Sequence, residues 1–235
     1  MSKFNSQSCR FQEPSLLQKH MDSFNILEVS AFIAAAESAR YFQRKMGNCV
    51  AANDDLQLLE LAVSWRRMKG LVMEFGVASG RTINYLAARM PQETIFGFDW
   101  FKGLPEPWRT GFDRGAFAHA PPQVLHNVEL VSGLFQDTLG KFLMTHQEPA
   151  SLLHIDCDLY ESTHVVLSAL AERIVPGTVI VFDEYVNYPG WKQHEFRAFQ
   201  EFVKAGSRHY EYLGFVPKHQ QVCVRMLPSD GSSPR

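Results

Sequence analysis

The chain has 235 residues, of which 46% are hydrophobic, so one α/β domain with an appended element can bury a full core without disulfide bonds. Its formal net charge of −2 excludes the basic surface that nucleic acids and anionic membranes require, and we expect a small-molecule partner instead. Four scattered cysteines (Cys9, Cys49, Cys157 and Cys223) form no C-x-x-C pair or metal-ligand spacing. Together with an N-terminus that lacks the apolar run of a signal peptide, they predict a reduced, cytoplasmic setting.

The first 69 residues are predicted to form an arm and a helical cap. Residues 1–15 are polar, and from Ser15 to about Met46 apolar residues recur at steps of three and four, which indicates a helix. A second helix is predicted from Asp54 to about Met68, because two acids stand at its start. We expect this cap to be a lid or the contact layer of a homodimer or higher homo-oligomer. Whether it only covers the sheet or also faces the substrate stays open.

Residues 70–227 alternate between strand and helix patterns, which predicts a doubly wound, mostly parallel α/β sheet of the Rossmann-like kind. After a first strand from Leu71, the predicted elements are helix 81–90, strand 94–99, strand 128–132, helix 136–146, strand 152–156, helix 162–173, strand 178–183 and helix 191–204. The segments 210–216 and 221–227 are joined by a linker too short for a helical crossover, so they predict an antiparallel hairpin. The Ser/Pro-rich tail 228–235 is predicted to be disordered.

A glycine turn follows the first strand in the run Leu71-Val-Met-Glu-Phe-Gly-Val-Ala-Ser-Gly80. Gly76 and Gly80 let the backbone take positive φ and approach a ligand, while the helix that begins next offers unpaired amide donors. A dinucleotide fingerprint would need glycine where Ala78 stands, and a Walker loop would need Lys-Ser or Lys-Thr after Gly80. The turn therefore disfavours a nicotinamide cofactor and a nucleoside triphosphate.

Two acids suggest which nucleotide the turn holds. Glu74 stands just before the turn, and Asp99 ends the next strand about 20 residues on, where a carboxylate can accept hydrogen bonds from both ribose hydroxyls. A ligand with a cationic amino acid portion and a ribose fits both acids, and S-adenosylmethionine has these parts. The alternative is a purely structural turn with solvent-facing acids.

More acids gather at the ends of two later strands, in the runs Leu153-His-Ile-Asp156-Cys-Asp158 and Ile180-Val-Phe-Asp183-Glu184. Parallel strands bring these ends to one edge, where the carboxylates repel unless a cation shares them. Oxygen ligands without clustered His or Cys indicate a hard ion, so we predict Mg²⁺ held by Asp156, Asp183 and Glu184. Single acids at strand ends also cap helices, and Asp158 could do only that.

Four motifs together resemble the metal-dependent class I S-adenosylmethionine methyltransferases of the macrocin O-methyltransferase type, which are distant relatives of catechol O-methyltransferase. The motifs are Glu74-Phe-Gly-Val-Ala-Ser-Gly80, Phe98-Asp-Trp-Phe-Lys-Gly-Leu-Pro-Glu-Pro107, His154-Ile-Asp-Cys-Asp-Leu-Tyr-Glu-Ser-Thr163 and Val181-Phe-Asp-Glu-Tyr185. The resemblance implies a seven-stranded sheet, methyl transfer to a hydroxyl held on magnesium, and adenine contacts near residues 133–137. The predicted cofactor contacts are Glu74, Gly76, Ala78, Ser79, Gly80, Asp99, Trp100, Gly133, Asp137 and Asp156.

The chain departs from that family at two positions. Glu184 stands where members that act on macrolide sugars carry a second aspartate. Leu159 stands where catechol O-methyltransferase has a lysine base. The candidate catalytic bases are therefore His194 and Asp158, since an imidazole suits proton transfer near neutral pH. His194 as a surface helix residue is the alternative, and His154 is interpreted as a core residue.

The predicted reaction is in-line attack of an acceptor hydroxyl, on a sugar or another metabolite, upon the sulfonium methyl. The segment from Trp100 to Pro122 is too long for an ordinary connection, so it either folds over the acceptor or packs on itself. Two other functions stay open: a protein that binds S-adenosylmethionine without methyl transfer, and a metal-assisted hydrolase.

Overall fold

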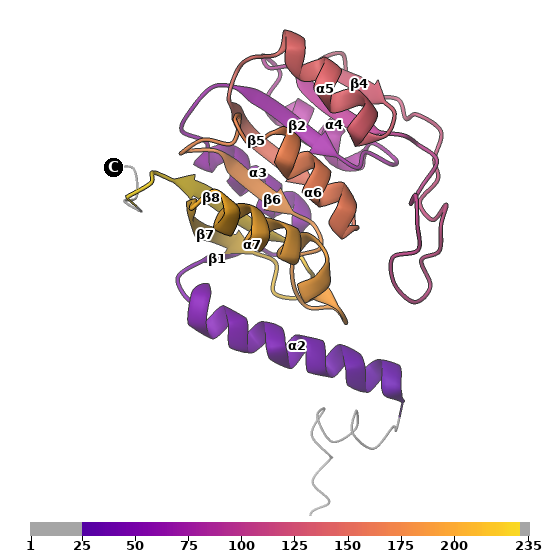
Figure 1. The fold of residues 1–235 in the computed structure, drawn as a ribbon, viewed down its shortest axis with the longest axis vertical. Coiled ribbons are helices and arrows are strands. Elements are labelled where there is room, and N and C mark those ends of the chain that lie inside the picture. The colour runs from indigo at the N-terminus through magenta and orange to yellow at the C-terminus, as the bar shows by residue number, and fades with distance from the viewer. Residues whose placement is uncertain (1–24, 231–235) are drawn as a thin grey trace, which may run out of the picture.

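The computed structural model describes residues 25–230, which form one sheet with helices on both faces (Figure 1). The strands lie in the order β1-β7-β8-β6-β5-β2-β3-β4. They are β1 (Val50–Ala51), β2 (Leu71–Phe75), β3 (Ile95–Asp99), β4 (Val128–Ser132), β5 (Ala150–Ile155), β6 (Val179–Phe182), β7 (His209–Phe215) and β8 (Val222–Leu227). The helices are α2 (Ile26–Lys45), α3 (Asp55–Trp65), α4 (Arg81–Arg89), α5 (Phe135–Thr145), α6 (Tyr160–Ala169), the 3₁₀ helix η1 (Trp191–Gln193) and α7 (Glu195–Ala205). The predicted α/β class and the antiparallel C-terminal hairpin are confirmed, because β8 runs antiparallel to both β6 and β7.

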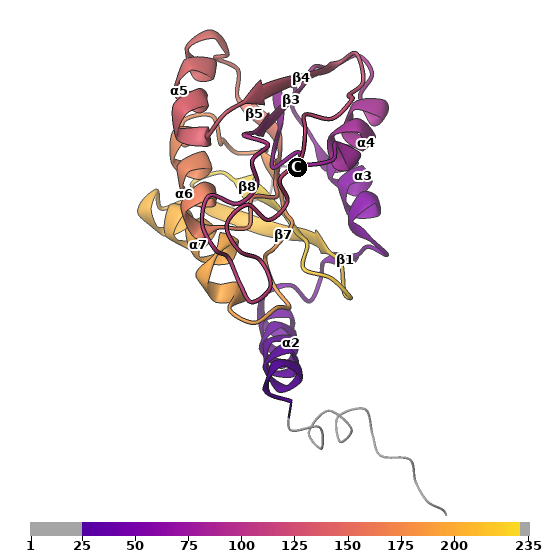
Figure 2. The same cartoon turned by 90° about the vertical axis from the view of Figure 1, so that its right-hand side faces the viewer.

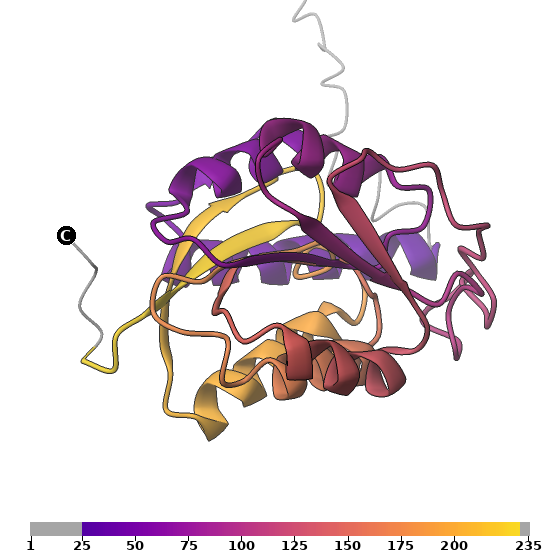
Figure 3. The ribbon, with the colours of Figure 1, turned by 90° about the horizontal axis from the view of Figure 1, so that it is seen from above.

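The sheet is the middle of three layers. Figure 2 shows α3 and α4 on one face and α5, α6 and α7 on the other, and the view from above in Figure 3 shows the same separation. Every residue of β2 and β5 is buried, as expected for central parallel strands covered on both sides. Side chains that alternate along β2 fall into two cores: Met73 packs on the α5 side and Val72 on the α3 side.

The central strands are in a register that brings their carboxyl ends together. Phe75 is paired with Ile155, and Ile155 with Phe182. The backbone amide of Asp156 donates to the carbonyl of Phe75 at 2.9 Å, and that of Asp183 to the carbonyl of Ile155 at 2.9 Å. The glycine turn and the acidic runs therefore leave neighbouring strands at one edge of the sheet.

Several boundaries differ from the sequence prediction. The described sheet has eight strands rather than seven, because Val50–Ala51 pairs in parallel with β7. Two residues are too few to show a periodic pattern. The predicted helix 191–204 is divided at His194 into η1 and α7, and the helix predicted over 162–173 begins and ends earlier, as α6.

Helix α2 projects from the body and packs against the β7 end of the sheet (Figure 2). Asn25 caps it by accepting a hydrogen bond from the amide of Leu27. The Tyr41 ring packs edge-on against Trp191 and Phe196, and its hydroxyl hydrogen-bonds that of Tyr212 at 2.5 Å. The predicted arm 1–15, the first part of the helix predicted from Ser15, and the end of the predicted tail lie outside the described residues. Within residues 25–230, no helix is long and apolar enough to cross a membrane.

Candidate active site

One cavity of about 830 Å³ lies at the carboxyl edge of the sheet and joins the glycine turn to the acidic runs. The turn and the end of β3 contribute Gly76, Ala78, Asp99 and Trp100 to its wall. The acids that follow β5 and β6 also line it, and these are Asp156, Asp158, Asp183 and Glu184. The cavity is thus large enough for a nucleotide and an acceptor fragment together.

The glycine turn is held in one conformation by close packing and by Asp99. Gly76 has φ +95°, and a Cβ there would overlap the backbone carbonyl of Asp156, so only glycine fits. One carboxylate oxygen of Asp99 accepts hydrogen bonds from the amides of Val77 and Ala78, both at 2.9 Å, and the other accepts from Phe101 at 2.6 Å. Asp99 therefore organises the turn and also lines the cavity.

Glu74 is fully buried in β2, and both of its carboxylate oxygens have partners. Oε1 accepts a hydrogen bond from the hydroxyl of Thr82 at 3.0 Å, and Oε2 lies 2.9 Å from Nδ1 of His154. The side chain lies behind the turn rather than among the cavity-lining residues. Direct contact of Glu74 with the cofactor stays a prediction, and its contacts point to support of the turn.

His154 links the cofactor turn to the acids. It is almost fully buried in β5, with Nδ1 on Glu74 and Nε2 at 3.8 Å from Oδ1 of Asp183. Burial alone would lower the pKa of His154, but the carboxylates of Asp183 and Glu74 outweigh burial and raise it well above the usual value. The positive imidazolium in turn holds the pKa of Asp183 below its usual value despite burial. The interpretation of His154 as a core residue was incomplete, since the core position also carries a charge.

The remaining acids of this cluster lack such a partner. Burial and the charge of Asp183 raise the pKa values of Asp156 and Glu184 well above the usual range. Oε2 of Glu184 is buried and has no hydrogen-bond partner. Ligand atoms of His154, Asp156 and Asp183 lie within 4.8 Å of one another. The two adjacent carboxylates fit a hard divalent cation, whereas Nδ1 of His154 is engaged by Glu74, and Glu184 is not a member of this close group.

The two candidate bases differ in position. Asp158 is buried, lines the cavity, and has φ +60°, a backbone region that aspartate tolerates better than most residues. Burial and Asp183 raise its pKa to about 7, although Arg109 acts in the opposite direction. His194 stands at the junction of η1 and α7 and is not among the cavity-lining residues. Its pKa is lowered by burial and by Arg109, so its imidazole is neutral at pH 7.

Glu195 is a part of the site that the sequence did not reveal. It is fully buried at the start of α7, and its carboxylate accepts hydrogen bonds from the amide of Glu184 at 3.0 Å and from the amide of Cys157 at 3.4 Å. It therefore fixes the two turns that carry the acids. In sequence it is one acid in the first turn of an amphipathic helix, a place where acids are common for other reasons.

The other predicted cofactor contacts divide between the cavity wall and its surroundings. Gly133 lines the cavity together with Leu134, Phe135 and Gln136, whereas Asp137 does not. Ser79 and Gly80 also lie outside the lining set. Gly80, with φ +79°, forms the N-cap of α4. The indole nitrogen of Trp100 donates to the carbonyl of Gly103.

The long segment between β3 and β4 contributes aromatic side chains beside the acids. Trp108 packs against Phe112, Tyr188 and His194, with ring centroids 5.3, 5.9 and 6.2 Å away. Phe112 stacks on Phe117, which lines the cavity and is half exposed. The segment packs on itself and also borders the cavity, and its folding over an acceptor stays a prediction.

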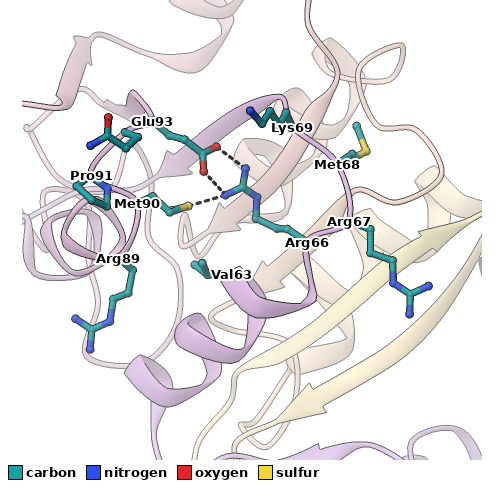
Figure 4. A pocket seen from close by; sticks show the side chains of 10 residues that line it. Val63, Arg66, Arg67, Met68, Lys69, Arg89, Met90, Pro91 and Glu93 are labelled. Carbon is teal, nitrogen blue, oxygen red and sulfur yellow. Dashed lines mark hydrogen bonds and ion pairs between the residues drawn. The ribbon is translucent and has the colours of Figure 1, made fainter.

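A second hollow, of about 530 Å³, lies near the amino ends of β2 and β3, at the opposite edge of the sheet (Figure 4). Its basic side chains include Arg66, whose guanidinium forms two hydrogen bonds with Glu93 and contacts the sulfur of Met90. This ion pair ties the end of α3 to the loop before β3. Arg66 and Glu93 in this hollow therefore stabilise the fold.

Comparisons with known proteins agree with this geometry. Residues 73–185 match the family model described as a methyltransferase domain. In sequence, no curated protein matches the chain. Three solved structures are similar in fold. A structure of the calicheamicin methyltransferase CalS11 has 22% identity and a TM-score of 0.62, and the match covers 96% of this chain and 99% of that one.

A second structure of CalS11, described as a TDP-rhamnose 3'-O-methyltransferase, has 24% identity and a TM-score of 0.55 over 73% of this chain and 78% of that one. The mycinamycin-pathway methyltransferase MycE, solved with Mg and SAH, has 14% identity and a TM-score of 0.50 over 78% of this chain and 58% of that one. At these identities the likeness shows the fold alone. Over residues 73–185, the family match and the Rossmann-like sheet together indicate a methyltransferase domain.

Proposed function

We propose that the protein transfers the methyl group of S-adenosylmethionine to a hydroxyl of a small acceptor, on a sugar or another metabolite. The observation that carries the proposal is the cavity that is lined by both the glycine turn and the acidic cluster. A nucleotide cradle alone would be compatible with simple binding. Acids beside the cradle provide groups that can bind and deprotonate a second substrate.

In this proposal the turn 76–80 and Asp99 hold the nucleoside, with residues 133–136 beside the adenine. Asp99 already accepts three backbone amides, so its remaining lone pairs would face the ribose hydroxyls. The contacts predicted for Ser79, Gly80, Glu74 and Asp137 stay proposals, and those residues support the wall from behind or beside it. The hydrogen bonds of Asp99 to the turn restrict its backbone, which lowers the entropic cost of binding.

Asp156, Asp183 and Glu184 would hold a divalent cation, with Mg²⁺ as the ion expected for oxygen ligands. When bound, such an ion lowers the pKa of an acceptor hydroxyl and orients it. His154 and Gln221 fix Asp183, because Gln221 donates to both of its oxygens at 3.1 and 3.2 Å. The structure of MycE, which is similar in fold, contains Mg, and this supports the proposal.

Asp158 is the base that we favour, since it lines the cavity two residues beyond Asp156. Its carboxylate would take the proton of the acceptor hydroxyl as that oxygen attacks the sulfonium methyl in line. His194 is the second candidate, because its neutral imidazole lies on the same side, in contact with Trp108. We also propose residues 70–227 as the methyltransferase domain with an N-terminal cap. Homo-oligomeric assembly and a cytoplasmic location stay predictions.

Isothermal titration calorimetry with S-adenosylmethionine, with and without Mg²⁺, tests the proposal first. We expect binding in both conditions. Mass spectrometry of a panel of hydroxylated acceptors then measures transfer of a methyl group. Failure to bind S-adenosylmethionine would overturn the proposed function, whereas binding without transfer to any acceptor would favour a protein that binds the cofactor only.

A further inference from the structure

Arg109 is held by aromatic rings at the border of the cavity. It belongs to the segment between β3 and β4, where a small turn pairs it with Phe112. Its guanidinium carbon lies 3.9 Å from the ring centre of Trp108, 4.9 Å from that of Tyr188 and 5.0 Å from that of Phe112. Three aromatic faces attract and orient a planar cation strongly, so the direction of this guanidinium is fixed.

The guanidinium of Arg109 has no polar partner among residues 25–230. Its Nε is buried without a hydrogen bond, and none of the ion pairs in that part of the chain includes it. Other arginines of the fold are paired: Arg66 with Glu93, and Arg225 with Glu211. Arg66 also has a buried Nε without a hydrogen bond, but its charge is paired with Glu93, whereas the charge of Arg109 has no such pair and is available to a ligand.

Arg109 also lies next to the groups proposed to carry out the chemistry. Trp108 and Tyr188, the rings that hold it, each lie 6.2 Å from the ring of His194. Its charge acts on Asp158, which lines the cavity. The cavity wall is otherwise strongly acidic at this side and would repel an anionic acceptor. Arg109 supplies the opposite charge beside this wall, although it is not itself among the cavity-lining residues.

We propose that Arg109 binds an oxyanion of the acceptor, so that the acceptor is a hydroxylated small molecule bearing a phosphate or a carboxylate. The planar donors of arginine match both groups in a bidentate way, and the aromatic rings keep the guanidinium oriented. Arg109 is therefore a specificity-determining residue. This inference rests on the proposed function, because it names the class of acceptor for the same cavity.

The test compares acceptors in pairs that differ in the anionic group. Rhamnose 1-phosphate and methyl rhamnoside form the phosphate pair, and 3,4-dihydroxybenzoate and its methyl ester form the carboxylate pair. Binding is measured by calorimetry on protein saturated with S-adenosylhomocysteine and Mg²⁺, and transfer is measured as kcat/KM. We expect the charged member of at least one pair to bind about tenfold more tightly or better. The pair that shows the preference identifies the anionic group.

The variants are Arg109→Gln, which removes the charge, Arg109→Lys, which keeps a charge but loses the planar fork, and the exposed Arg114→Gln on the same segment as the control. We expect Arg109→Gln to remove the preference in binding while leaving the binding of the neutral member and of S-adenosylmethionine unchanged. Arg109→Lys should keep part of the preference and Arg114→Gln all of it.

Three results would overturn the inference: no charged member bound in preference, a preference that survives Arg109→Gln, or an equal loss for charged and neutral members, which would indicate a structural role. Loss of S-adenosylmethionine binding by the wild-type protein would instead contradict the proposed function, and the first titration shows this separately.

Discussion

The two walls of the cavity differ in how well their polar groups are satisfied. On the cofactor side, Asp99 and Glu74 have hydrogen-bond partners on both carboxylate oxygens. On the acidic side, Oε2 of Glu184 is buried without one, and the pKa values of Asp156 and Glu184 are raised by burial and by Asp183. The protein thus forms one wall completely from its own groups, while the other wall needs a bound cation or protons to be stable.

His154 is where the two walls meet, since it contacts Glu74 on one side and approaches Asp183 on the other. The one buried imidazolium of His154 therefore pairs with Glu74, whose oxygens are both hydrogen-bonded, and also lies close to Asp183 in the acidic cluster. We therefore expect the cofactor wall to tolerate loss of a metal and the acidic wall to be destabilised by it.

Replacing the shared histidine should damage both walls. We expect His154→Ala to lower the free energy of unfolding by about 3–5 kcal/mol, because two buried carboxylates lose their cationic partner. Chemical denaturation followed by circular dichroism measures it. The exposed His126→Ala is the control and should be nearly neutral. A loss as small as that of the control would show that His154 does not join the walls.

Removing an acid should affect one wall only. Asp183→Asn should reduce methyl transfer about a hundredfold or more, because substitutions of groups that merely orient metal ligands already cost about 10- to 100-fold. The affinity for S-adenosylmethionine should stay nearly unchanged. Steady-state kinetics and calorimetry on the same preparations measure both, with the exposed Asp113→Asn as the control. Parallel loss of cofactor affinity and transfer would contradict the separation of the walls.

Asp99→Ala should weaken the binding of S-adenosylmethionine and leave ion binding by the acidic cluster unchanged. The amides of Val77, Ala78 and Phe101 lose a charged acceptor. Hydrogen bonds to charged groups contribute about 1.5–3 kcal/mol, so the affinity for S-adenosylmethionine should fall about ten- to a hundredfold. Titration with Mn²⁺, monitored by electron paramagnetic resonance, should show unchanged ion binding. Weakened ion binding with normal cofactor affinity would contradict the assignment of Asp99 to the cofactor wall.

The smallest effect is expected at Thr82, whose hydroxyl donates to Glu74. Thr82→Val keeps the shape and removes this one hydrogen bond, which should cost about 1 kcal/mol of unfolding free energy. Thermal denaturation measures it, and Thr145→Val, at the exposed end of α5, is the control. An effect equal to that of the control would mean that Glu74 is held by His154 alone.

The sequence predicted the fold well because apolar periodicity and turn residues determine most of the elements. The strand predicted over residues 128–132 has the same bounds in the structure. The Asp156, Asp183 and Asp99 positions at the carboxyl edge followed from parallel strands alone. Local patterns contain no information about contacts between distant residues, so the pairing of Glu74 with His154 was not foreseen.

The same reason explains the parts of the site that were missed. Glu195 reaches the backbone after β5 and β6 only because α7 starts beneath both turns. Its binding of the Glu184 amide coincides with the break at His194 that the helical pattern did not show. The aromatic cage of Arg109 joins residue 109 to Tyr188, which is about 80 residues away in the chain. Such contacts depend on the packing of whole elements.

A crystal structure of the protein with S-adenosylmethionine and Mn²⁺ tests the central claim most directly, since the anomalous signal of manganese locates the ion. The nucleoside should lie over the turn at Gly76 with its ribose at Asp99, and the sulfonium methyl should point toward Asp158. The ion should lie among Asp156, Asp183 and Glu184. A methyl group directed away from the acids, or manganese bound elsewhere, would contradict the assignment of one wall to the cofactor and the other to the acceptor.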